Sequence, residues 1–290
     1  MKAHQKFRRW SSQPMNCAKS KEDNMAFKIV VCAKQVPDTN EIRINPETGT
    51  LIRDGVPSIL NPDDANALEM ALELKDKYDD VHVTVVTMGP PQAKDLLFEA
   101  LAMGADEGVL LTDRAVGGSD TWATSNAVAA AIRYVGDFDI LIGGRQAIDG
   151  DTAQVGPQIA EKLNLPQVTY VQEYEFSDDM KSVKAQRQLE DGYETVEVKL
   201  PCMLTCIKEL NTPRYMNMKG IFADKTESIK VLSAADVGVD LTTVGLKASP
   251  TNVFKSFTPK PKGKGVTVAG DTEKELADNL LIGLKDKQVI

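Results

Sequence analysis

The feature that most constrains the fold is an alternation of short apolar runs with longer amphipathic segments. The apolar runs, rich in β-branched residues, cover residues 28–33, 81–88, 107–112 and 138–143. The segments between them predict helices over residues 63–77, 91–103, 119–134 and 151–163. The helix starts carry Pro, Gly, Ser or Asp, with Ser119 as an expected N-cap. Such units predict an α/β fold, with an open, mostly parallel sheet and helices on both faces.

The pattern changes after Pro166. Short strands are predicted over residues 167–176, 181–189, 193–199 and 203–207, which together form an antiparallel meander beside the parallel sheet. A further hairpin is predicted over residues 41–53, around the turn NPETG. Beyond residue 211 the chain reads as irregular and rich in Pro, until a last helix over residues 272–286.

These patterns predict three parts. Residues 1–24 form a leader, residues 25–210 an α/β domain, and residues 211–290 a C-terminal arm. The arm either packs on a second subunit or is a flexible linker. The leader is either a disordered extension, an upstream start before Met25, or an organellar transit peptide, and we leave it out of the fold.

Charge and hydropathy exclude some classes of protein. The chain has 290 residues and a net charge of -8, which argues against a general nucleic-acid binder. The leader holds six basic and two acidic side chains, a net of +4, so the rest of the chain carries -12. Because no run of about 18 apolar residues occurs, we expect no membrane-spanning segment.

Cysteine and histidine are scarce. The four cysteines form no CxxC pair, and the two histidines are His4 and His82. Disulfide scaffolds, zinc sites and histidine-based acid–base catalysis are therefore poorly supported. We expect no metal site and no catalytic side chain.

Two Gly-rich segments follow predicted strands and lead into helices. Ligands of open parallel sheets bind beyond the carboxyl ends of the strands, and helix N-termini favour phosphate groups. The segments GGSDT (117–121) and GGRQAIDGDTAQVGP (143–157) are therefore the candidate nucleotide cradles. Neither segment matches GxGxxG, and no GxxxxGK[ST] motif occurs. The first segment is equally explained as a capped loop, and Asp120 would oppose a phosphate there unless it turns outward.

The sequence also resembles a known family. The stretch AQRQLEDGYETVEVKLPCMLT (185–205) is similar to the characteristic stretch of the small (beta) subunit of electron-transfer flavoproteins. The resemblance covers residues 26–290. It is supported by VCAKQVPDT (31–39), NPDD (61–64), TMGPP (87–91), ALAMGADEG (100–108) and GRQAIDGDTAQVGP (144–157). It implies a Rossmann-like, adenine-nucleotide-binding fold.

The resemblance further implies a subclass. The combination of VPDT (36–39), GGSDT and GRQAIDGDT is similar to the electron-bifurcating type, in which FAD takes the place of a structural AMP. That type implies NADH as electron donor and a heterodimer with the large (alpha) subunit. Its electrons go to an acyl-CoA or other flavin dehydrogenase and to ferredoxin or flavodoxin, in the cytoplasm. The alternatives are a non-bifurcating carrier that holds AMP and an adenylate-binding sensor protein.

The resemblance implies contacts to the cofactor from two loops and from several strand and helix ends. These residues are Cys32, Pro37, Asp38, Asn61, Asp63, Met88, Gly118, Thr121, Thr124, Ala147, Ile148, Asp149, Gly150, Asp151, Thr152, Gln154, Val155 and Gly156. Pro37 and Asp38 are the expected neighbours of the isoalloxazine ring. N-capping is the alternative for Thr121 and Asp151, and core packing is the alternative for Met88.

The segment CIKELNTPRY (206–215) is similar to the loop by which the small subunit anchors to partner dehydrogenases. The resemblance assigns partner binding to Leu210, Asn211 and Pro213. Leu210 is expected to be exposed and to insert into the partner. The alternative is that Leu210 packs locally.

Overall fold

The computed structural model describes residues 26–38, 57–251, 253–254 and 263–290. Its main feature is a nine-stranded sheet with the order β11-β5-β4-β1-β6-β10-β7-β8-β9. Seven neighbouring strands, from β11 to β7, are parallel, and β8 and β9 extend the sheet as antiparallel strands. The strands are β1 (Phe27–Cys32), β4 (Val81–Met88), β5 (Glu107–Leu111), β6 (Ile140–Gly144), β7 (Gln167–Phe176), β8 (Ser182–Leu189), β9 (Gly192–Lys199), β10 (Cys202–Cys206) and β11 (Ile229–Leu232). The predicted α/β fold class is therefore confirmed.

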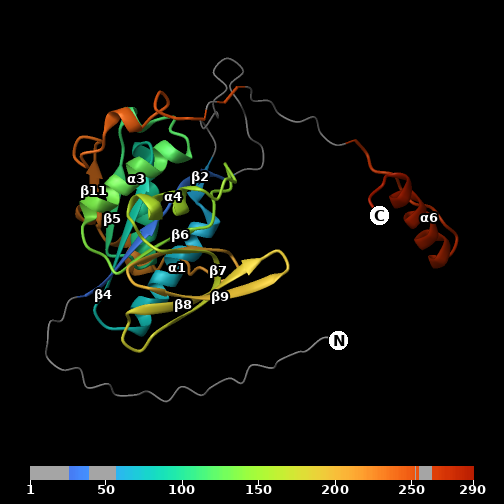
Figure 1. Cartoon of the computed structure of the whole chain (residues 1–290), viewed down its shortest axis with the longest axis horizontal. Coiled ribbons are helices and arrows are strands. Elements are labelled where there is room, and N and C mark those ends of the chain that lie inside the picture. Colours follow the sequence, from blue (N-terminus) through green and yellow to red (C-terminus); the bar gives the residue numbers. More distant parts are fainter. Residues whose placement is uncertain (1–25, 39–56, 252, 255–262) are drawn as a thin grey trace. The chain divides into compact units, whose positions relative to one another are not determined.

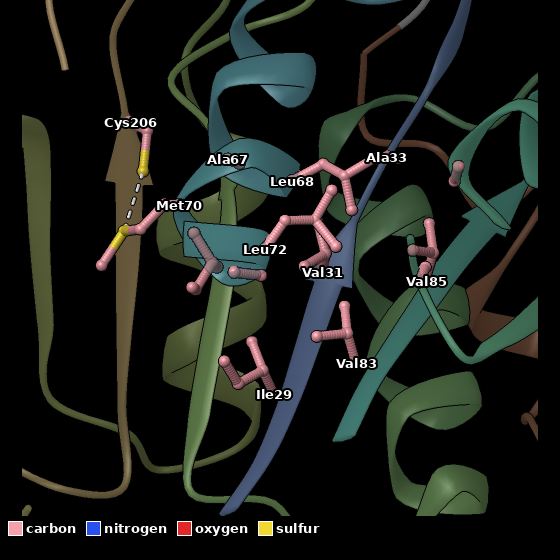
Figure 2. Close-up of a cluster of buried hydrophobic side chains, with 14 of the residues drawn as sticks. Ile29, Val31, Ala33, Ala67, Leu68, Met70, Leu72, Val83, Val85 and Cys206 are labelled. Atoms are coloured by element: carbon pink, nitrogen blue, oxygen red, sulfur yellow. Dashed lines mark hydrogen bonds between the residues drawn. The ribbon is translucent and has the colours of Figure 1, made fainter. Parts of the chain in front are cut away.

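Helices cover both faces of the parallel sheet (Figure 1). They are α1 (Pro62–Lys77), α2 (Lys94–Met103), α3 (Thr121–Val135) and α4 (Val155–Lys162). Successive strand residues point to opposite faces, so Ile29 and Val31 of β1 pack in the cluster with α1 and α2. Val30 packs in the other cluster, with α3 and α4. Figure 2 shows the first cluster, where Cys206 of β10 meets Met70 of α1.

The order of the strands reverses beside β1. The chain runs from β1 through α1 to β4 on one side, and later returns through α3 to β6 on the other side of β1. Ile29 of β1 is in register with Val83 of β4 and with Ile140 of β6. In an open α/β sheet such a reversal opens a crevice at the carboxyl ends of the two central strands. The carboxyl ends of β1 and β6 are therefore the first place to look for a ligand site.

The predicted four-strand meander is wrong for its last strand. β7, β8 and β9 are antiparallel as expected, but β10 lies between β6 and β7 and is parallel to both. All five of its residues are buried, because both faces of a central parallel strand are covered. The apolar run 202–206 without alternation is typical of such a strand.

Two helix starts also differ from the prediction. α4 begins at Val155 rather than residue 151, because Asp151 and Ala153 have positive φ angles of 48° and 52°, which a helix cannot contain. α3 begins at Thr121 with Asp120, not Ser119, as its N-cap. Ser119 instead donates a hydrogen bond to the carbonyl oxygen of Val116.

Residues beyond 211 are not all irregular. β11 pairs with β5 at the edge of the sheet, and the short helix α5 spans Met218–Phe222. Among the described residues, contacts place those up to 251 in one compact unit and those from 253 onward in a second. The α/β body thus extends past the predicted boundary at residue 210. The leader 1–24 and the hairpin predicted over 41–53 lie outside the described residues. On either side of the predicted hairpin, two short strands, β2 (Gln35–Pro37) and β3 (Ser58–Leu60), pair in antiparallel fashion.

The second unit contains the helix α6 (Glu273–Asp286), close to the predicted range. Thr272 caps its N-terminus by accepting a hydrogen bond from the backbone N–H of Glu275. Leu276 and Leu280 share one side of the helix and are exposed within this unit. Within the described part of the chain, every helix is too short or too polar to cross a bilayer.

Candidate nucleotide site at the ends of β1 and β6

Asn61 fastens the polar loop after β6 to the end of β1. Its backbone N–H donates to the carbonyl oxygen of Lys34, 3.0 Å away. Its fully buried side chain donates to the carbonyl oxygen of Gln146 at 2.8 Å and accepts from the backbone N–H of Ile148 at 3.0 Å. Asn61 therefore fixes the loop at Ala147–Ile148 from its buried side. Both polar groups of its side chain already have hydrogen-bond partners within the protein.

Asp64, three residues after Asn61, joins the ends of the same two strands. Its carboxylate accepts the backbone N–H of Lys34 at 2.8 Å and that of Gly144 at 2.9 Å. Burial raises the pKa of this carboxyl to about 7, against the lowering effect of these two N–H groups. Gly144 has to be glycine, because a Cβ there would lie 2.4 Å from an Asp64 oxygen and 2.7 Å from the α1 backbone.

Two cations border the crevice. The Lys34 ammonium lies 2.6 Å from Asp149, whose side chain is only 9% exposed. The Arg145 guanidinium lies 3.3 Å from Asp63 and 5.6 Å from the centre of the Tyr170 ring. Burial raises the pKa of Asp63, and Arg145 opposes that effect. Each cation is thus paired with a predicted site acid.

The loop continues as a tight turn toward α4. The backbone N–H groups of Gly150 and Asp151 both donate to the carbonyl oxygen of Ala147. Gln146 donates to the Asp151 carboxylate at 2.8 Å. A Cβ at Gly150 would meet no atom within 4 Å, so the loop tip is open. Thr152, exposed, lies just after this turn.

The N-terminus of α4 offers free donors. No side chain of the described residues caps its first turn. Gly156 packs against β10 so closely that a Cβ would lie 2.7 Å from the Thr205 methyl group, which brings Val155 and Gly156 to the sheet. Uncapped first-turn N–H groups at the end of a parallel sheet are the donors that a phosphate prefers.

The two predicted cradles lie next to each other. The Thr121 hydroxyl donates to the Gln154 side chain at 3.0 Å, and Ser125 donates to Gln158 one turn further along. Thr124 points back to the carbonyl oxygen of Ser119. Gly118 takes a positive φ of 72°. The start of α3 therefore borders the loop that leads into α4.

Asp120 turns away from this junction. Its carboxylate accepts the backbone N–H groups of Ala123 and Thr251, at 3.0 and 2.9 Å. Burial alone would raise the pKa of Asp120, but these N–H groups hold it below its usual range. Because the carboxylate already neutralises the positive end of α3, a phosphate is better placed at α4 than at α3.

The remaining predicted cofactor contacts lie at strand ends. Cys32 ends β1, and burial raises the pKa of its thiol to about 12, so it stays neutral. Met88 ends β4 and packs against the core cluster beneath α3 and α4. Pro37 is buried in β2, whereas Asp38 is exposed and donates its N–H to the carbonyl oxygen of Pro57. Whether these residues touch a ligand stays a prediction.

The predicted partner loop follows β10. Leu210 is half-buried and packs against the core cluster beneath α1 and α2, so it is less exposed than expected, and its role in partner binding stays a prediction. Asn211 bonds to Asn66 of α1, and Pro213 is half-buried beside it. The local-packing alternative for Leu210 thus describes the isolated subunit.

Sequence reasoning missed Lys34 and Asp64. Both lie within the quoted motifs VCAKQVPDT and NPDD, but the pattern does not tell which of two adjacent acids at a helix start faces the sheet. In the structure Asp64 faces the strand ends, whereas Asp63 faces Arg145. The donor set fits an adenine dinucleotide or mononucleotide: backbone N–H groups for phosphate, carboxylates and amides for ribose, and apolar strand ends for a ring.

Comparison with known proteins assigns the family. The chain matches the Electron transfer flavoprotein domain over residues 48–237. It is 57% identical over 264 residues to a Caffeyl-CoA reductase-Etf complex subunit, CarD, of Acetobacterium woodii, covering 91% of this chain and 100% of that protein. It is 58% identical, with the same coverage, to an Electron transfer flavoprotein subunit beta of Clostridium acetobutylicum. An Acryloyl-CoA reductase electron transfer subunit gamma of Anaerotignum propionicum is 51% identical over 272 residues, again covering 91% and 100%. The family match and these identities together show that the chain belongs to the electron transfer flavoprotein family, as a beta subunit.

Proposed function

We propose that this beta subunit binds FAD in the crevice between β1 and β6 and bifurcates electrons taken from NADH. One electron goes through the FAD of the alpha subunit to a flavin dehydrogenase, and the other goes to a ferredoxin or flavodoxin in the cytoplasm. The observation that carries the proposal is the loop 144–154, which Asn61 and Asp64 fasten to both strand ends at the reversal of strand order.

The residues of the chain have binding and positioning roles in this proposal. The free N–H groups at the start of α4 would hold the phosphates. Asp149 would accept hydrogen bonds from ribose hydroxyls, and the Gln154 amide could donate to them or accept from them. Lys34 and Arg145 would offset the charges of Asp149 and Asp63, so that these acids do not repel the phosphates. When bound, FAD supplies two-electron and one-electron redox chemistry, so no side-chain nucleophile is needed. The neutral Cys32 thiol agrees with such a role.

The bifurcating type is favoured over the AMP-holding carrier by one contact. Thr121, a contact expected only in the FAD-binding subclass, lies within hydrogen-bond distance of Gln154. A cofactor larger than AMP would therefore meet both segments at once. The names of two relatives, which refer to reductases of caffeyl-CoA and acryloyl-CoA, support the same choice. Both compounds are 2,3-unsaturated acyl thioesters, so we propose an acyl-CoA dehydrogenase as the partner.

Quantifying the bound cofactors tests the proposal. The chain is co-purified with its alpha subunit, the heterodimer is denatured, and released FAD and AMP are measured. We expect two FAD per heterodimer and no AMP. One FAD with one AMP would refute bifurcation and identify an AMP-holding carrier. A complex without flavin would refute electron transfer altogether and favour the adenylate-binding sensor.

A further inference from the structure

Helix α1 holds the segment after β10 by a closed pair of asparagines. The Asn66 amide donates to the backbone carbonyl and to the side-chain oxygen of Asn211, both at 2.9 Å. The Asn211 amide donates in return to the Asn66 carbonyl oxygen at 3.0 Å. Asn66 is buried, so these bonds are shielded from water. The backbone of Asn211 is thereby fixed to the second turn of α1.

One turn later a buried carboxylate holds Arg214. Glu69, whose side chain is 6% exposed, accepts the backbone N–H of Arg214 at 2.9 Å and its Nε and Nη2 groups at 2.9–3.0 Å. The guanidinium also reaches Asp76 at 2.7 Å. Hydrogen bonds to Glu69 raise the pKa of Arg214. This bidentate ion pair, together with the bond to the backbone N–H, fixes both the backbone and the side chain of Arg214.

The core does not need this pair. Neighbouring positions of α1, such as Leu68 and Met70, pack against the sheet. Placing a charge in the core, as at Glu69, costs desolvation that the ion pair repays only in part, so the pair contributes little to stability compared with apolar residues of similar size. The pair of Glu69 and Arg214 instead holds the segment before Tyr215 in a single conformation. The next side chain, that of Tyr215, is 96% exposed, and the chain then returns to the body at Asn217, which donates to the carbonyl oxygen of Ala102 in α2.

We propose that Asn66 and Glu69 are positioning residues for partner recognition: they fix residues 211–214 on α1 before a flavin dehydrogenase docks. The inference rests on the proposed function and deepens it, because residues 206–215 are the predicted anchor. A loop fixed in advance loses less conformational freedom on binding, so affinity rises without any new contact. Neither Asn66 nor Glu69 touches the nucleotide loop, which Asn61 and Asp64 hold from the first turn of α1.

The test separates docking from cofactor binding. The double variant Glu69→Met with Arg214→Met removes the pair without leaving a buried charge, and Asn66→Ala removes the amide bonds. Each variant is purified as the heterodimer and assayed in NADH-driven reduction of an enoyl-CoA, with a fixed excess of ferredoxin to take the second electron and with varied amounts of an acyl-CoA dehydrogenase. We expect the KM for the dehydrogenase to rise about tenfold, while kcat and flavin content change less than about twofold. Amide hydrogen exchange in residues 208–215 should accelerate, and that in residues 144–154 should not.

The control is Lys75→Met on the same helix. Lys75 pairs with Asp106, and its exposure is similar to that of Arg214, but its partner lies far from the predicted anchor in the chain. Faster exchange with an unchanged KM would overturn the inference, as would an equal rise of the KM in the control. If Leu210→Ala raises the KM and the Asn66 and Glu69 variants do not, only the inference falls. If the unaltered heterodimer reduces no acyl-CoA dehydrogenase, the proposed function falls, and the inference falls with it.

Discussion

The carboxylate of Asp64 has two structural roles. It joins the ends of β1 and β6 by accepting two backbone N–H groups, and it occupies the first turn of α1, where a negative charge is favoured. The same position removes it from water, so burial raises its pKa to about 7. A single residue thus joins the two strand ends and carries a carboxyl whose pKa lies near neutral pH.

The raised pKa predicts a loss of stability on going from acid to neutral pH. The folded chain holds the Asp64 proton more tightly than the unfolded chain, where the pKa is near 3.8. The resulting stabilisation is full below pH 3.8 and disappears as the pH rises through about 7. Between pH 5 and pH 8 we expect the free energy of unfolding to fall by about 3 kcal/mol on account of this residue.

Urea unfolding of the cofactor-free chain at the two pH values measures this effect. Asp64→Asn cannot titrate, so the fall should be smaller in that variant by about the same amount. Asp113→Asn is the control, because N–H groups from Ala115 and Ala234 lower the pKa of that carboxyl and it has already ionised at pH 5. Parallel curves for the original chain and Asp64→Asn would show that Asp64 is ionised throughout.

At the scale of elements, the close approach of α1 to β6 depends on Gly144. A Cβ there would collide with the backbone of Asp63 and Asp64, and a helix backbone cannot give way as a flexible side chain can. Gly150, in the same loop, faces open space and does not have a positive φ. The two glycines therefore make a matched pair for mutation.

We expect Gly144→Ala to lower the free energy of unfolding by about 3 kcal/mol and Gly150→Ala by less than about 0.5 kcal/mol. Denaturant unfolding of the two variants measures the difference. Gly150→Ala should nevertheless release FAD more readily from the heterodimer, because the loop tip is a predicted contact. Equal losses of stability in both variants would contradict the proposed packing of α1 on β6.

The elements that repeat could be predicted from the sequence, and those that depend on distant pairing could not. The four βα units of the body are marked by local periodicity, so their strands are found within a few residues. The place of β10 is set by its partners β6 and β7, which no local pattern reveals. β11 was not predicted, because only four of its residues pair with β5. Likewise the polar loop 144–154 was predicted, but the clamp by Asn61 and Asp64 required the fold.

At the scale of the whole molecule, the chain combines an α/β body with a separate C-terminal unit. The body has its own core on both faces of the sheet, whereas the second unit by itself leaves large apolar side chains of α6 uncovered. Leu276, Leu280 and the half-buried Leu284 are spaced four residues apart and line one side of α6. An apolar stripe that its own unit leaves uncovered is typical of a segment that packs on another surface, and we expect that surface to be the alpha subunit.

We therefore expect removal of residues 263–290 to leave the body folded and to weaken the heterodimer. Covering several Leu and Ile side chains contributes about 1.5–3 kcal/mol each at most, of which association consumes a part. The Kd for the alpha subunit should rise at least about a hundredfold, measured by analytical ultracentrifugation, while the thermal unfolding of the body stays the same.

Leu276→Ser with Leu280→Ser should reproduce the loss, because it removes the stripe and keeps the helix caps. Lys274→Ser with Asp278→Ser, on the same helix, is the control. If the truncated chain binds the alpha subunit as tightly as the full chain, the stripe does not contribute to the heterodimer interface.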